Sequence, residues 1–156
     1  MKNLLILIIA VASMTTVKAQ SLSTSYFEIN AGTANIDDLD GWFPGTSFLY
    51  GVKTINKDNL ILDVQAGIAF PSIVTGKIGT GIYFPEAKTA LTVGVRPWPA
   101  HGYGQIEFYT PKERGSWTIS YETSAFTVLG ERFDFASMNS RTIINVGYRF
   151  RFRPRN

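Results

Sequence analysis

The segment Ile144-Asn145-Val146-Gly147-Tyr148-Arg149-Phe150-Arg151-Phe152 alternates apolar and polar residues without a break. Because successive side chains of a β-strand point to opposite faces, the segment predicts a strand with one apolar face and one polar face. The polar face mixes charge with glycine. The same combination recurs along the chain, and it decides the fold class.

Seven further segments of similar length are rich in Val, Ile, Tyr, Phe and Thr and end at Gly, Pro, Asn or Asp. They are longer than ordinary globular strands and suit tilted strands that cross a bilayer. The predicted fold class is therefore all-β: a closed antiparallel up-and-down transmembrane β-barrel of about eight strands. The expected strands are residues 25–34, 46–55, 60–70, 75–84, 90–98, 103–110, 116–125 and 142–152.

The connections between these strands fall into two groups. Residues 56–59, 85–89 and 111–115 form short polar turns, whereas residues 35–45 and 126–141 are expected to form longer loops. Membrane barrels alternate short periplasmic turns with longer outer loops. The remaining two connections are short, so the alternation is partial.

The beginning of the chain has the layout of a cleavable signal peptide. Lys2 precedes an apolar run, and the small-residue site Val17-Lys18-Ala19 follows it. We expect residues 1–19 to be removed and residues 20–156 to form one outer-membrane barrel domain. The expected localisation is the outer membrane, after export through the inner membrane.

Composition narrows the chemistry. Without residues 1–19 the chain keeps 13 basic and 12 acidic residues, so its charge does not favour nucleic acid as a partner. The chain has no cysteine and one histidine, His101. These numbers exclude thiolate and His-rich metal sites, and we expect no metal and no cofactor.

The polar faces of the predicted strands carry charges of both signs together with several glycines. An eight-stranded barrel has an interior barely wide enough for side chains, where small residues make room for large ones. Buried charges there must be paired, so we expect a lumen plugged by ion pairs and no open pore. The predicted network consists of Glu28, Lys53, Asp63, Lys77, Arg96, Glu107, Glu122, Arg149 and Arg151.

The order of the strands indicates which of these charged residues should lie close together. Closing the barrel would bring Glu28 near Arg149 or Arg151. Glu107 and Glu122 on adjacent strands could instead form a paired-carboxylate site, but ion pairing explains them better.

Aromatic residues near strand ends are expected to form the interfacial girdles of a membrane barrel; they are Tyr26, Tyr50, Trp98, Tyr109, Trp117 and Phe152.

The closing segment, residues 144–152, resembles the terminal strand of Gram-negative outer-membrane barrels. The resemblance implies that Tyr148, Phe150 and Phe152 act as the signal for the barrel-assembly machinery. The chain departs from this pattern in continuing with Arg153-Pro154-Arg155-Asn156. Its layout is similar to small OmpA-like or OmpX-like barrels of the cell envelope, and Gln20 after the cleavage site is similar to exported proteins of Bacteroidetes.

The function expected from this resemblance is non-enzymatic: an envelope scaffold, a loop-presenting binding protein or an accessory subunit of an outer-membrane assembly. Its expected partners are outer-membrane lipids, the assembly machinery and other outer-membrane proteins. Exposed aromatic residues on a loop often mark a contact site. The candidate loop-contact residues are Asp37, Asp38, Asp40, Trp42, Phe43, Phe133 and Phe135.

Two alternatives remain open at the level of sequence. The first is a barrel enzyme that modifies lipid A, which would need His101 beside a serine such as Ser72 or Ser124; the alternative for His101 is an ordinary loop residue. The second is a secreted soluble β-barrel that carries a small ligand, because a soluble barrel shows the same alternation with its faces exchanged.

Overall fold

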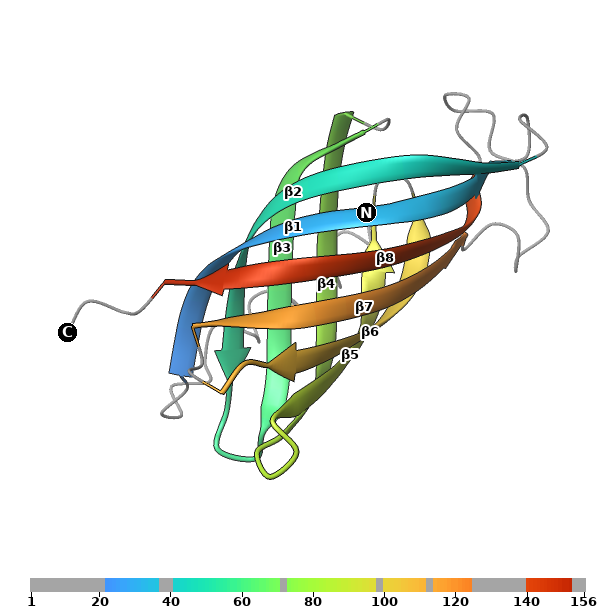
Figure 1. Cartoon of the computed structure of the whole chain (residues 1–156). Helices are drawn as coiled ribbons and strands as arrows, with labels where there is room; N and C mark the ends of the chain where they lie inside the picture. The colour runs from blue at the N-terminus through green and yellow to red at the C-terminus, as the bar shows by residue number, and fades with distance from the viewer. Residues whose placement is uncertain are drawn as a thin grey trace, which may run out of the picture.

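The protein forms a closed barrel of eight antiparallel strands (Figure 1). The computed structural model describes residues 22–36, 41–70, 73–97, 100–111, 114–124 and 140–152. Each strand pairs with the next, and β8 pairs with β1 to close the barrel. The predicted all-β up-and-down topology is confirmed. The strands are β1 (Leu22–Ile36), β2 (Gly41–Ile55), β3 (Leu60–Phe70), β4 (Ile73–Phe84), β5 (Thr89–Arg96), β6 (His101–Tyr109), β7 (Gly115–Ser124) and β8 (Ser140–Arg151).

The register of the strands fixes the stagger of the barrel. From Asn30 in β1, the paired residues of β2 and β3 lead to Ile73 in β4. In the other direction, through β8, β7, β6 and β5, they lead to Tyr83, ten residues further along β4. A stagger of this size on eight strands requires the strands to be strongly tilted relative to the barrel axis.

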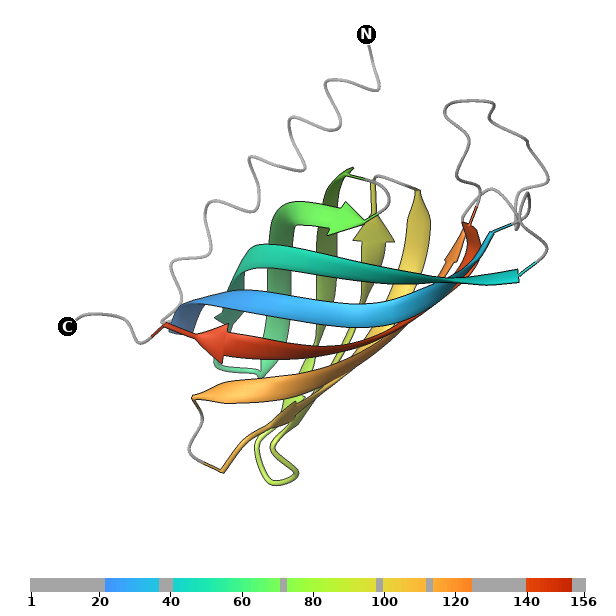
Figure 2. The same cartoon turned by 45° about the horizontal axis from the view of Figure 1, so that its top comes forward.

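The two ends of the barrel differ in their connections. The turn end carries residues 56–59, 85–88 and 110–114, and it also holds the start of β1 and the end of β8 (Figure 2). At this end Asn56 Oδ1 accepts hydrogen bonds from the backbone N–H groups of Asp58 and Leu60. The far end carries the other four connections, of which residues 125–139 form by far the longest.

The predicted long first loop, residues 35–45, is wrong. β1 and β2 extend as a paired ladder until Ile36 lies opposite Gly41, so only residues 37–40 connect them. The sequence misleads because Pro44 resembles a loop residue. Proline is tolerated where a strand has a free edge, and β2 has one here because its pairing with β3 ends at Thr46.

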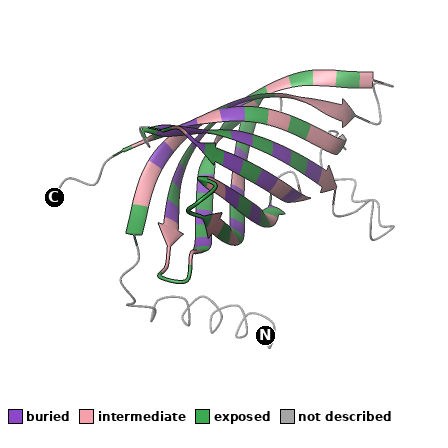
Figure 3. Cartoon of the chain, turned by 60° about the horizontal axis from the view of Figure 1, so that its bottom comes forward, coloured by how far each residue is buried: buried purple, intermediate pink, exposed green. Residues whose placement is uncertain are grey.

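Burial alternates along every strand, as Figure 3 shows by its purple and green bands. Among the described residues, twenty-eight large hydrophobic side chains are exposed, nearly all of them on the outward face, whereas six hydrophobic residues are buried. The buried side chains are otherwise polar or charged. The barrel therefore has a polar interior and an apolar exterior, the reverse of an ordinary globular domain.

Glycines on the inner face make room for two interior tyrosines. Tyr26 lies opposite Gly51 and Tyr103 lies opposite Gly94 on the neighbouring strands. A Cβ atom added at Gly51 would run into the Tyr26 ring, and one added at Gly94 would meet both the Tyr103 ring and the Ile78 carbonyl oxygen. Each tyrosine ring thus occupies the space that a side chain larger than glycine would need at the opposite position.

The replacement Gly94→Ala should lower the free energy of unfolding by about 1–3 kcal/mol, the usual cost of overpacking. Its Cβ atom would press on backbone, which cannot move aside as a flexible side chain can. The matched control is Gly104→Ala on the adjacent strand, where a Cβ atom meets nothing within 4 Å. Urea unfolding followed by tryptophan fluorescence would compare them; equal loss of stability would contradict the packing argument.

Candidate functional site: the charged interior

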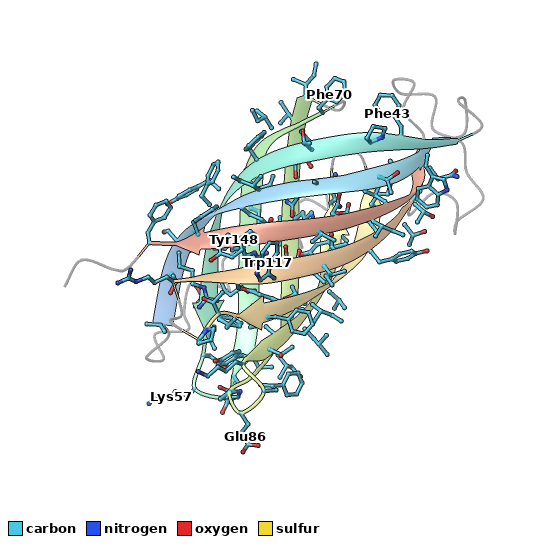
Figure 4. All side chains as sticks on the ribbon, viewed as in Figure 1. Phe43, Lys57, Phe70, Glu86, Trp117 and Tyr148 are labelled. Carbon is cyan, nitrogen blue, oxygen red and sulfur yellow. The ribbon has the colours of Figure 1, made fainter. Side chains whose placement is uncertain are left out.

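The inner face of the barrel gathers the charged side chains of the strands. All nine residues of the predicted ion-pair network point inward, although they come from all eight strands. They include every Asp, Glu, Lys and Arg whose side chain is described within a strand. The all-side-chain view shows nitrogen and oxygen atoms inside the ribbon and mostly carbon on its outer surface (Figure 4).

Arg149 on β8 is the centre of the larger group. Its Nη1 atom donates hydrogen bonds to Asp63 Oδ2 at 2.9 Å and Glu107 Oε2 at 3.0 Å. Its Nε atom donates to Glu28, which lies directly opposite on β1. Arg149 therefore connects three carboxylates on three other strands, and its side chain is fully buried.

Two further cations complete this group. Arg151 Nη2 donates to Glu107 Oε1 at 3.0 Å, and Lys53 pairs with Glu107 and lies 3.8 Å from Asp63 Oδ2. We call Glu28, Lys53, Asp63, Glu107, Arg149 and Arg151 the Arg149 cluster. It holds three acids and three bases, so its formal charges cancel.

Neutral side chains satisfy the remaining carboxylate oxygens of the Arg149 cluster. The Tyr26 hydroxyl donates to Asp63, and the Ser116 hydroxyl donates to Glu107. Asn30 Nδ2 donates to Glu28 Oε1 at 2.8 Å. Buried charges are tolerated only when they are both paired and hydrogen-bonded. Each charged group of this cluster has an oppositely charged partner and at least one hydrogen bond, although Arg149 Nη2 makes none.

A second group surrounds Glu122 on β7. Lys77 Nζ and Arg96 Nη2 each lie 2.8 Å from Glu122 Oε1, and Asn145 Nδ2 donates to the same oxygen at 3.0 Å. We call Lys77, Arg96 and Glu122 the Glu122 cluster. Glu107 and Glu122 thus belong to different clusters, and the two carboxylates are held by different cations.

Tyrosine rings line the cations of both clusters. The Arg149 guanidinium carbon lies 4.3 Å from the centroid of the Tyr26 ring, and that of Arg151 lies 3.8 Å from the Tyr109 ring. Lys77 Nζ lies 5.2 Å from the Tyr103 ring. Such cation–π contacts add stabilisation that grows as the site is desolvated.

The predicted interfacial position of Tyr26 and Tyr109 is wrong. Both tyrosines are buried in the interior, on the same inner faces as Glu28 and Glu107. Their positions near strand ends suggested an interfacial girdle. The alternation of side chains along each strand, however, places them on the inner face. Tyr50, Trp117 and Phe152 are exposed as expected, and Trp98 lies outside the described residues.

His101 is not a loop residue, as one interpretation of the sequence had it. It begins β6, is buried in the interior, and lies opposite Ser124 of β7. Glu122, two residues before Ser124, lies on the same inner face of β7. A histidine in this place faces away from the outer surface, so an ester of a surrounding lipid would have to enter the barrel to reach it.

The candidate loop-contact residues are only partly placed. Trp42 and Phe43 lie within β2 rather than in a loop, and Trp42 is exposed. The Phe43 ring lies 6.1 Å from that of Phe70 at the far end (Figure 4). Asp37, Asp38, Asp40, Phe133 and Phe135 lie outside the described residues.

The residues of the predicted assembly signal lie along β8 and just beyond it. Phe150 and Phe152 are exposed on the outer surface. The Tyr148 ring packs edge-on against Trp117 of β7, with centroids 5.1 Å apart, and against Phe150 at 4.7 Å (Figure 4). The apolar face of the terminal strand thus forms a continuous aromatic surface with its neighbour.

The described residues hold no group of three or more His, Cys, Asp or Glu side chains arranged to bind a metal ion. Within the same ranges no helix is long and apolar enough to cross a membrane. Comparison with protein-family models, curated proteins and solved structures gave no significant match to this chain.

The replacement Arg149→Met should lower the free energy of unfolding by about 3–5 kcal/mol, because it leaves three buried carboxylates facing only two cations. Adding Glu28→Gln to this variant restores the charge balance and should recover part of the loss. Urea unfolding of the single and double variants gives the coupling directly. A double variant less stable than Arg149→Met would contradict the charge-balance argument.

Proposed function

We propose that the protein is a non-enzymatic outer-membrane β-barrel of a Gram-negative envelope with a plugged interior. In this proposal residues 1–19 direct export and are removed, and residues 20–156 insert into the outer membrane. The single observation that carries the proposal is the inverted distribution of side chains. In the strands every Asp, Glu, Lys and Arg whose side chain is described faces inward, and the outward face is built largely of large apolar residues.

An aqueous location would leave this outer face unexplained. Soluble monomers rarely expose contiguous apolar patches larger than a few hundred Å², whereas here the apolar residues surround the whole barrel. A soluble ligand-carrying barrel would place them inside and the charges outside. Acyl chains are the surroundings that favour an exterior of Leu, Ile, Val and Phe.

The height of the apolar band supports the same location. β3 presents apolar side chains outward from Leu60 to Phe70. Its eleven residues cover roughly 33 Å along the strand, which a tilt of about 40° reduces to roughly 25 Å. An apolar band of about 25 Å is typical of outer-membrane barrels.

The ends of the barrel suggest its orientation. Membrane barrels keep short turns on the periplasmic side, so we place the turn end, with the start of β1 and the end of β8, in the periplasm. The residues 125–139 then lie on the outside of the cell. Exposed aromatics such as Trp117 and Phe152 would lie near the inner headgroups.

The proposed role is structural or recognitional. The barrel would act as an envelope scaffold, present its outer connections to a partner, or serve as an accessory subunit of an outer-membrane assembly. Its immediate partners would be outer-membrane lipids and the barrel-assembly machinery, which would read Tyr148, Phe150 and Phe152. The inward position of His101 does not favour the alternative of a lipid A-modifying enzyme.

Spin labels test the membrane location. The chain has no cysteine, so single cysteines at Leu62, Phe150 and Lys57 can each carry one label. In the protein folded in vesicles, labels at Leu62 and Phe150 should collide more with oxygen than with a water-soluble nickel complex. The label at Lys57, in an exposed turn, should show the reverse. Water-accessible labels at Leu62 and Phe150 would refute the proposal.

The plugged interior predicts little or no conductance in planar bilayers. The Arg149 cluster and the tyrosines that pack on it leave charged side chains buried rather than bathed in a channel. Insertion should be verified on the same sample by the different migration of boiled and unboiled protein on gels. A stable open channel of the wild-type protein would contradict the plugged interior without contradicting the membrane location.

A further inference from the structure

The two clusters of the interior differ in charge balance. The Arg149 cluster is neutral, but the Glu122 cluster has two cations and one carboxylate among the described residues. Lys77 and Arg96 are almost fully buried, at 1% and 6% exposure. A buried charge without a counter-charge is strongly unfavourable. Lys77 and Arg96 share the single carboxylate of Glu122, so the described side chains of this cluster carry one positive charge in excess.

The hydrogen-bond donors near the Glu122 cluster point to the same deficit. Within the described ranges, Arg96 Nε, Tyr103 Oη and Gln105 Nε2 are buried and have no hydrogen-bond partner. Lys77 Nζ, although paired with Glu122, also makes no hydrogen bond. The acceptors left without a partner in the same region number three: Gln105 Oε1, Glu122 Oε2 and Gln65 Oε1, the last on the β3 residue that lies opposite Lys77. Unmade buried hydrogen bonds carry a desolvation cost, so these donors favour a further acceptor.

The register brings the donors to one region of the interior. Tyr103 lies directly opposite Glu122 on the neighbouring strand, and Lys77 Nζ lies 5.2 Å from the Tyr103 ring. Gln105 follows Tyr103 on the same inner face of β6. Arg96 lies opposite His101 at the adjoining strand end, and His101 lies opposite Ser124, two residues from Glu122 on β7.

We propose that the Glu122 cluster binds one small monovalent anion of halide size. Lys77 and Arg96 would supply the charge, and the side chains of Tyr103 and Gln105 would donate neutral hydrogen bonds. Glu122 holds both cations through Oε1, and its Oε2 atom makes no hydrogen bond. The carboxylates of Glu122, Asp63 and Glu28, which all act electrostatically on Tyr103, oppose the anion. The narrow interior of an eight-stranded barrel favours a halide over a larger anion. The site does not depend on the membrane location.

Bromide is the probe for the test, because it scatters anomalously. Protein folded in detergent micelles would be heated in sodium bromide or sodium gluconate at equal ionic strength, and loss of the compact gel band would be followed. A ligand that binds only the folded state stabilises it with the logarithm of its concentration. We expect the midpoint to rise by roughly 4 °C per tenfold increase in bromide above its dissociation constant.

Two variants and one control make the test specific. Lys77→Gln leaves Arg96 and Glu122 as a balanced pair, so the variant should lose the bromide dependence and be no less stable than wild type in gluconate. Glu122→Gln leaves two cations without their carboxylate and should depend on bromide more strongly. Arg151→Gln changes the Arg149 cluster and should keep the wild-type dependence.

Crystals grown in bromide provide the direct measurement. We expect an anomalous peak within contact distance of Lys77 Nζ and Arg96 Nε in wild type and its absence in Lys77→Gln. Equal midpoints of the wild-type protein in bromide and gluconate would overturn the proposal. An unchanged bromide dependence in Lys77→Gln, or a peak elsewhere only, would overturn it as well. If Glu122→Gln fails to fold, the other variants still decide the question.

Discussion

The structure depends on one constraint: eight strands close around a narrow interior in which the described charged side chains are buried against one another. A charge in this space cannot retain its hydration, so it must meet an opposite charge. Arg149 meets that requirement by contacting acids on β1, β3 and β6 at once. The same contacts join distant parts of the circumference. Ion pairs and the closed backbone ladder take the place of a hydrophobic core.

The narrow interior also explains the glycines. A tyrosine ring that packs on a cation needs a flat neighbour, and Gly51 and Gly94 provide one for Tyr26 and Tyr103. Charge, aromatic ring and glycine therefore form one packing arrangement rather than three separate features. The outer face shows no comparable arrangement, because its residues are similar in kind, large and apolar. The packing of the barrel therefore depends more on which residues occupy the inner face than on which occupy the outer face.

Much of this arrangement was predictable from the period of two. The eight strands follow from the eight alternating segments, and the inward direction of the nine charged side chains follows from their alternate positions along those strands. The contact of Glu28 with Arg149 follows from the pairing of β8 with β1. Pairs across the barrel, such as Arg149 with Asp63, depend on the ten-residue stagger, which no local pattern encodes. Tyr26 was misplaced because its position near a strand end outweighed its parity. Trp42 was misplaced because the free edge of β2 accepts Pro44.

The distribution of roles within the barrel follows from these arguments. Under the proposed function, an exterior that faces acyl chains carries little information about a particular partner, since any apolar residue of similar size would serve. An interior closed by the Arg149 cluster is inaccessible to a large ligand from the turn end. Under the proposed function, recognition of a partner must then come from the far end, where β1 and β2 extend beyond β3 and where residues 125–139 connect β7 to β8. The aromatic residues Trp42 and Phe43 already lie at that end, so a contact surface there needs no new fold element.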